Sequence, residues 1–182
     1  MLPDSLLCRE ALAHVGASAP RAVVHHSIRT YLLARAYARA EGIGFDDDGL
    51  CLAALFHDLG LCSRHFDRAR PFPESSNLAL AEFLEERGFD TARTSPITDA
   101  VAHHFRFFPP WSVGPLAGLL QVGAWMDTLR RKRSRFRDYA RTIEDAYPRL
   151  GFDHKFPLLV LRSLGGPRSG LGLFFPQHRR QS

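Results

Sequence analysis

The sequence has few cysteines, few lysines and no long apolar run. Its three cysteines, Cys8, Cys51 and Cys62, are an odd number without CxxC spacing, which argues against a disulfide framework and fits a reducing compartment. The longest apolar run, residues 50–56, has seven residues, whereas a membrane span needs about 20. Charged residues also interrupt the N-terminus before a secretory signal could form. We therefore expect a cytoplasmic protein that does not enter a membrane.

Lysine is scarce, since 22 of the 24 basic residues are arginine. The net charge of +5 is mild for a nucleic-acid-binding protein of this size. Six of the positive charges lie in one run, residues 130–137, which we interpret as the solvated end of a helix, where cations are favourable. A nucleotide or nucleic-acid contact is the alternative for this run, but no motif of a nucleic-acid-binding fold accompanies it. Nucleic acid is therefore not expected as a partner.

The 182 residues are 45% hydrophobic and 24% charged, a balance that suits one globular domain over residues 1–182. Apolar residues recur with helical period between prolines and glycines, and no segment alternates as a strand would. The pattern predicts a single-domain, all-α helical bundle with helices near residues 4–15, 20–41, 47–60, 75–87, 97–108, 114–131, 134–146 and 154–164. We expect residues 62–74 to form an ordered loop and a loosely held tail to begin at about residue 165.

The helix predicted at residues 47–60 should be buried on all sides. One face carries a stripe of leucines and a phenylalanine, and the opposite face offers only cysteine and alanine besides His57 and Asp58. The doublet is therefore buried or lines a cavity. A buried carboxylate without a partner costs several kcal/mol, so some cation must compensate Asp58.

Three other predicted helices place an ionisable residue within an apolar face. These residues are His26, His104 and Asp127. The neighbours His25 and His103 point about 100° away on their helices, so we expect them to lie outside the site. A glycine one turn before Asp127 allows its helix to pack closely.

These buried polar groups can be satisfied separately or together. A lone histidine on an apolar face is most often a satisfied core residue, Asp58 could accept backbone N–H groups, and Asp127 could pair with Arg29. Two carboxylates and two or three imidazoles are nevertheless hard to satisfy one by one in a small domain. A shared divalent metal satisfies them together, because imidazole and carboxylate are its natural ligands.

The order of these residues resembles the HD-domain superfamily of metal-dependent hydrolases. The resemblance implies an all-α bundle in which His26, His57, Asp58 and Asp127 hold one divalent metal, zinc in the first place, with iron or manganese as alternatives. It covers about residues 20–130. Five stretches within it are closest to the cyanamide hydratase type, namely residues 26–31, 53–61, 81–88, 97–104 and 123–127.

Two features of the sequence depart from branches of this superfamily. The Phe-Glu pair of the cyanamide hydratase type is replaced by residues 70–74, where prolines intrude and the acid is displaced. Di-iron members need two more histidines before the last Asp, and here only His65, His103 and His104 lie in that interval. His65 follows the doublet too closely, and the other two supply one helix position, so we expect a mononuclear site.

The predicted activity is metal-assisted addition of water to a small molecule, most specifically a nitrile or cyanamide-type substrate. In this hypothesis His104 delivers a proton to the developing anion, and Arg29 orients Asp127 or binds an anionic group. A phosphohydrolase acting on a nucleotide or phosphate ester is one alternative, with Arg106 as a further cation. A non-catalytic ligand-binding module is another, and a homo-oligomer is possible in each case.

An aromatic segment, residues 105–111, follows His104. It is interpreted either as a wall of the substrate pocket or as plain core packing, since aromatic residues also dominate cores. In the first interpretation, the residues expected around the metal are apolar, namely Leu33, Phe108, Leu120 and Trp111.

Overall fold

The computed structural model describes residues 1–130 and 133–164. These residues form eight α-helices and two short 3₁₀ helices and contain no strand, so the predicted all-α fold is confirmed. In chain order the elements are α1 (Leu6–Ser18), α2 (Arg21–Ala40), α3 (Asp47–Phe56), η1 (Leu59–Leu61), α4 (Phe72–Glu85), α5 (Thr91–His103), α6 (Pro115–Thr128), η2 (Arg133–Phe136), α7 (Arg137–Ala146) and α8 (Phe152–Leu164). The tail expected from about residue 165 lies outside the described residues.

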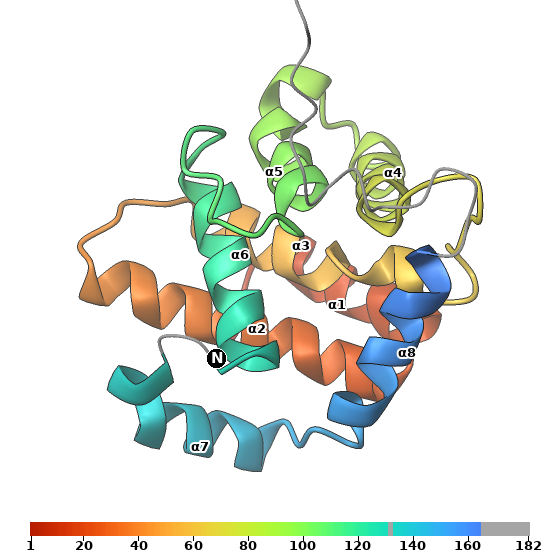
Figure 1. Cartoon of the computed structure of the whole chain (residues 1–182). Coiled ribbons are helices and arrows are strands. Elements are labelled where there is room, and N and C mark those ends of the chain that lie inside the picture. The colour runs from red at the N-terminus through yellow and green to blue at the C-terminus, as the bar shows by residue number, and fades with distance from the viewer. Residues whose placement is uncertain (131–132, 165–182) are drawn as a thin grey trace, which may run out of the picture.

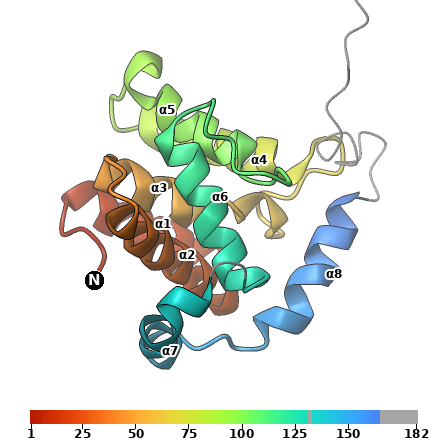
Figure 2. The same cartoon turned by 60° about the vertical axis from the view of Figure 1, so that its left-hand side comes forward.

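Helix α2 is the axis of the bundle. It has twenty residues and packs along α6 and against α3 (Figure 1). Helices α4 and α5 lie together at one end of the molecule and α7 at the other, while α8 stands at the flank beside α2 and η1 (Figure 2). The hydrophobic core is drawn mainly from α2, α3 and α6, with further residues from α1, α4 and α5. None of the helices among the described residues is both long enough and apolar enough to span a bilayer.

Helix α3 is buried on all sides as predicted, since every residue from Gly49 to Phe56 is buried. The prediction that the helix continues to residue 60 is wrong. It ends at Phe56, and Asp58 already has non-helical backbone angles (φ −107°, ψ 8°). The reason is the close approach of α4 to the following turn. A Cβ at Gly60 would collide with the Phe72 carbonyl oxygen, and the Gly60 N–H donates to Ser76 Oγ over 2.9 Å.

The boundaries of α4 and α5 also differ from the prediction. Helix α4 starts at Phe72 rather than residue 75, because a proline in the first turn, here Pro73, needs no hydrogen-bonded N–H. Helix α5 starts at Thr91, six residues earlier than predicted, and continues through Pro96. It ends at His103, so His104 lies just beyond the helix rather than within it.

Gly123 allows α6 to lie directly on α2. A Cβ at this position would collide with the Thr30 carbonyl oxygen and would lie 2.7 Å from the Ala34 Cβ. Both atoms belong to α2, and neither can move without shifting the helix. The close contact places Asp127, one turn further along α6, next to the face of α2 that bears His26.

We expect Gly123→Ala to destabilise the fold. Overpacking of this kind costs about 1–3 kcal/mol, which lowers the melting temperature of a chain of this size by roughly 2–4 °C per kcal/mol. Thermal unfolding followed by circular dichroism measures this change. Gly16→Ala in α1 is the control, because no atom lies within 4 Å of its added methyl group and alanine favours the helix. Equal melting temperatures of the two variants would contradict the packing argument.

Candidate metal centre

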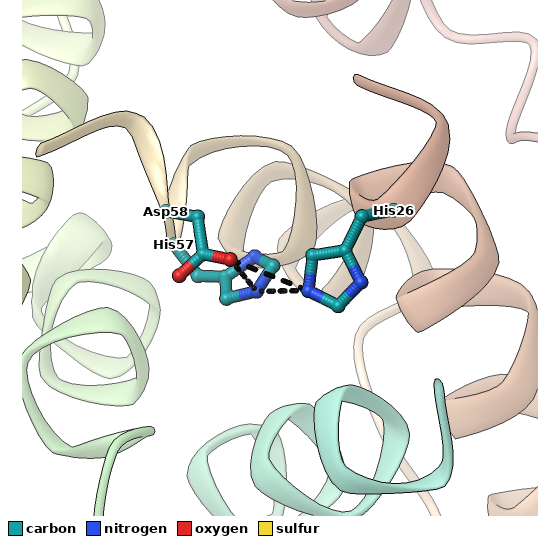
Figure 3. A group of neighbouring side chains, drawn as sticks. All are labelled: His26, His57 and Asp58. Atoms are coloured by element: carbon teal, nitrogen blue, oxygen red, sulfur yellow. Dashed lines mark hydrogen bonds and ion pairs between the residues drawn. The ribbon is translucent and has the colours of Figure 1, made fainter. Parts of the chain in front are cut away.

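Three side chains converge in the interior, as Figure 3 shows. His26 comes from α2, and His57 and Asp58 come from the turn after α3. All three are buried, with at most 1% of their surface exposed. The Nε2 atoms of the two histidines are 3.1 Å apart, and Asp58 Oδ2 lies 3.3 Å from His26 Nε2 and 3.2 Å from His57 Nε2. The three atoms form a nearly equilateral triangle.

The proton on each nearby imidazole is directed away from this triangle. Nδ1 of His26 lies 2.7 Å from Asp127 Oδ2. Nδ1 of His57 and of His104 lie 2.8 and 2.6 Å from backbone carbonyl oxygens three residues earlier. Since carboxylate and carbonyl oxygens only accept, each Nδ1 donates, and each neutral ring therefore presents a lone pair at Nε2.

These lone pairs face the carboxylate of Asp58. His26 and His57 face its Oδ2, and His104 Nε2 lies 3.7 Å from its Oδ1. Acceptors facing acceptors make no hydrogen bond, and Asp58 Oδ2 and His104 Nε2 indeed have no hydrogen-bond partner among the described residues. Buried acceptors without donors are costly. A cation between them removes that cost.

The donor set fits a divalent metal. A tetrahedral ion with bonds of about 2.0–2.1 Å keeps its ligand atoms roughly 3.3 Å apart, close to the 3.1–3.3 Å sides of the triangle. Imidazole nitrogen and carboxylate oxygen suit zinc, iron and manganese alike. The backbone and carboxylate partners at Nδ1 hold the rings in orientation, as the outer contacts of metal-bound histidines do.

The protonation states favour the same conclusion. Burial lowers the pKa of His57, which keeps the ring neutral as a ligand must be. Burial also opposes protonation of His26, but the nearby carboxylates of Asp127 and Asp58 outweigh burial and raise its pKa. Burial would raise the pKa of Asp58, yet the imidazoles of His57, His104 and His26 around it hold that pKa well below its usual range. The carboxylate is thus ionised, and an imidazolium at His26 is the cation available when no metal is bound.

Asp127 lies on the opposite ring nitrogen of His26 rather than in the triangle. Its two oxygens also accept from Arg29, from Nε over 2.8 Å to Oδ1 and from Nη2 over 2.8 Å to Oδ2. Burial opposes ionisation of Asp127, but hydrogen bonds from His26 and Arg29 hold its pKa below the usual range. These contacts are those of a carboxylate that orients His26. Direct ligation by Asp127 stays a prediction.

Arg149 is a residue that the sequence analysis missed. Its Nη1 donates to Asp127 Oδ1 over 3.0 Å, and its Nη2 donates to the Asp127 carbonyl oxygen over 3.1 Å. It also pairs with Glu144 and Asp153. Arg149 lies between α7 and α8, far along the chain from the other site residues, and no local pattern marks it.

A cavity of about 480 Å³ lies over the triangle. His26, His57, Asp58 and His104 form its polar floor. Its walls come from α6, from α8 and from the segment after His104, and their large side chains are Phe105, Phe107, Trp125, Phe152, Phe156 and Leu161. The ring of Phe152 stacks on that of His26, with 4.2 Å between centroids.

The prediction of the residues that form the cavity wall was largely wrong. Leu33 and Leu120 belong to the hydrophobic core, Phe108 is 74% exposed, and Trp111 packs over Gly118. None of the four lines the cavity. The aromatic segment contributes other members, Phe105 and Phe107, and half of the wall residues come from α8.

The helical phase that separates His25 from His26 is confirmed, and His104 is buried although it lies just beyond the end of α5. His26 and His104 are buried at the cavity floor, and neither His25 nor His103 lines the cavity. The His25 ring instead contacts the Pro148 carbonyl oxygen. Arg29 and Arg106 do not line the cavity either. Arginines of the basic run pair with acidic side chains of the protein itself, in the contacts Arg133–Glu144 and Arg135–Glu41.

Comparison with known families agrees with this geometry. A family model described as HD domain matches residues 23–145. The chain belongs to the HD-domain family. This family consists mostly of metal-dependent hydrolases, and the match includes every residue of the cavity floor and Asp127 but ends before α8. No curated protein matched the chain.

We expect the purified protein to bind one divalent metal per chain and His57→Ala and Asp58→Ala to lose it. A metal at 1,000 times its dissociation constant stabilises the folded state by about 4 kcal/mol, so a chelator should lower the melting temperature of the unaltered protein but not of these variants. Elemental analysis and thermal unfolding measure both effects. His103→Ala, outside the cavity, is the control. Metal content well under one equivalent after reconstitution would refute the site.

We expect Asp127→Asn to lower the free energy of unfolding by about 3–5 kcal/mol, because it leaves the buried Arg29 without its anion. Asp153→Asn, which removes a partly exposed partner of Arg149, should cost at most about 1 kcal/mol. Denaturant unfolding compares the two. Metal titration of Asp127→Asn then tests ligation, since a purely orienting role preserves the stoichiometry at saturating metal. Similar small losses of unfolding free energy in both variants would contradict the inferred hydrogen-bond network around Asp127.

Proposed function

We propose that the protein is a metal-dependent enzyme that adds water to, or hydrolyses, a neutral small molecule, with a nitrile or cyanamide-type compound as the leading substrate. One observation carries the proposal. The ring nitrogens of His26 and His57 and the carboxylate of Asp58 converge at the floor of a cavity with apolar walls. Such a site combines a place for a Lewis acid with a space for an uncharged organic molecule.

A divalent metal held by these three residues, with Asp127 as the fourth predicted ligand, would supply a water whose pKa is lowered toward about 7. Asp58 lies between the imidazoles, and its ionised carboxylate gives the cavity floor a negative charge. His104 Nε2 is free to carry a proton, because Nδ1 is committed to a backbone carbonyl. When the oxygen of water bonds to a nitrile carbon, the water gives one proton to His104 Nε2, one carbon–nitrogen π bond breaks, and His104 passes that proton to the nitrogen.

A phosphohydrolase is the second candidate, and membership of the HD-domain family favours it. Phosphoryl transfer spreads negative charge over three oxygens and relies on several cations. Arg29, the cation nearest the floor in the prediction, is fully buried and bonded to Asp127 and to the Tyr147 carbonyl oxygen. No lysine or arginine is among the described residues that line the cavity wall, and this supports the hydratase. A non-catalytic binding module is the third candidate, but intact metal-site residues favour an enzyme.

We expect metal-reconstituted protein to hydrate cyanamide-type or nitrile compounds and to leave nucleotides and generic phosphate esters intact. His104→Gln should lower kcat by about 10²–10⁴-fold, because it removes a general acid, while the metal content stays near that of the unaltered protein. His103→Gln is the matched control and should keep most of the activity. Hydrolysis of phosphate esters instead would select the second candidate, and metal binding without any turnover would select the third.

A further inference from the structure

The walls of the cavity are almost wholly apolar. Four helical positions of α8, Phe156, Pro157, Val160 and Leu161, face a second apolar surface formed by α6 and the segment 105–107. Some of these side chains are costly to leave in water, since Phe107 is 49% exposed and Leu161 is 67% exposed. Exposed aromatic and aliphatic side chains around a cleft are typical of a ligand-binding site.

The charges around the cavity disfavour an anion. Among the described residues that line it there is no lysine or arginine, and the lining residue with a charge outside the floor is Asp153. Hydrogen bonding to Arg149 lowers the pKa of Asp153 and outweighs the opposing effect of burial, so this side chain is negative. Arg149 is itself shared among Asp127, Glu144 and Asp153. Apart from the metal proposed at the floor, a phosphate group would meet two carboxylates and no free cation among the described residues that line the cavity.

The size of the cavity disfavours the smallest substrates. Its volume is about 480 Å³, whereas a water molecule takes about 30 Å³ of the liquid. Cyanamide has only three non-hydrogen atoms, and it would leave most of this space to water against aromatic walls. Filling the space with an apolar group instead removes both ligand and wall surface from water.

The element that forms much of this wall lies outside the HD-domain match. The HD-domain match ends at residue 145, and α8 begins at Phe152. Phe152 stacks on the ring of His26 and on that of Phe156 at 4.8 Å, so the wall is continuous with the floor. The residues that would hold the metal thus lie within the match, whereas half of the wall that would hold the substrate body comes from α8, after it.

We propose that this cavity takes a neutral substrate whose reacting group is attached to an apolar body at least the size of one aromatic ring, and that α8 selects it. The inference rests on the proposed function for the reaction at the floor, but binding can be measured without turnover. It excludes phosphate esters as ligands even when their organic part is the same. It also makes cyanamide itself a poor ligand.

The test compares three probes that separate charge from size. Benzonitrile carries the ring and a neutral group, phenyl phosphate carries the same ring and a charged group, and acetonitrile carries the neutral group without the ring. Dissociation constants are measured by ligand-observed NMR or calorimetry on metal-loaded and chelator-treated protein. We expect benzonitrile to bind about tenfold or more tightly than either other probe, the ratio that burial of a ring supports.

Two variants of α8 form the matched pair. Val160→Arg places a cation and a longer side chain in the wall. It should weaken the binding of benzonitrile about tenfold and strengthen the binding of phenyl phosphate. Leu158→Arg makes the same change at a residue that is 67% exposed and does not line the cavity. It should alter neither constant by more than about twofold. Circular dichroism establishes that both variants are folded.

The outcomes separate this inference from the proposed function. Benzonitrile binding that responds only to Val160→Arg supports the inference, even if no nitrile is turned over and the hydratase proposal fails. Tighter binding of phenyl phosphate or inorganic phosphate to the unaltered protein overturns it. Turnover of cyanamide by protein that neither binds benzonitrile nor is inhibited by it also overturns the inference, while the proposed function stands.

Discussion

The negative charge of Asp58 has to be compensated inside an apolar bundle, and the arrangement of the interior follows from that need. Three imidazoles surround the carboxylate, and each has its Nδ1 proton committed to an acceptor on the far side of the ring. The Nε2 atoms that face the carboxylate therefore carry lone pairs and cannot donate to it. Only a proton on His26 or a bound metal satisfies this group, and a metal satisfies all of its members at once.

The second carboxylate extends this constraint across the fold. Asp127 on α6 ties His26 and Arg29 of α2 to Arg149 in the loop before α8. The close packing at Gly123 makes this reach possible, because α6 lies near enough to α2 for a short aspartate side chain to bridge them. A disturbance in the α2–α6 contact is therefore transmitted to the orientation of the His26 ring, and through Arg149 to the start of α8.

The sequence predicted the parts of the site that follow helical periodicity. His26 was separated correctly from His25, because one position in a helix faces the core and its neighbour does not. His104 also reaches the cavity floor, but from just beyond the end of α5. The end of α3 was not predictable in this way, since the apolar pattern continues to Leu59 and Leu61 although the chain turns at Asp58. What ends the helix is the tertiary approach of α4 at Gly60, which leaves no local signal.

The cavity wall was the least predictable feature, for a related reason. The aromatic segment after His104 was predicted as the wall because it is adjacent in sequence. Phe108 is nevertheless exposed to solvent, and the wall is completed by α8, roughly fifty residues later. Residues that coordinate or orient an ion need particular atoms at fixed distances, so their identities stand out even in a single sequence. Residues that surround an apolar ligand need only size and lack of charge, so they resemble any core helix. The metal-binding residues at the floor can thus be predicted from the sequence. The residues that would select the substrate can be identified only from the structure, in which α8 lies across the cavity from α6.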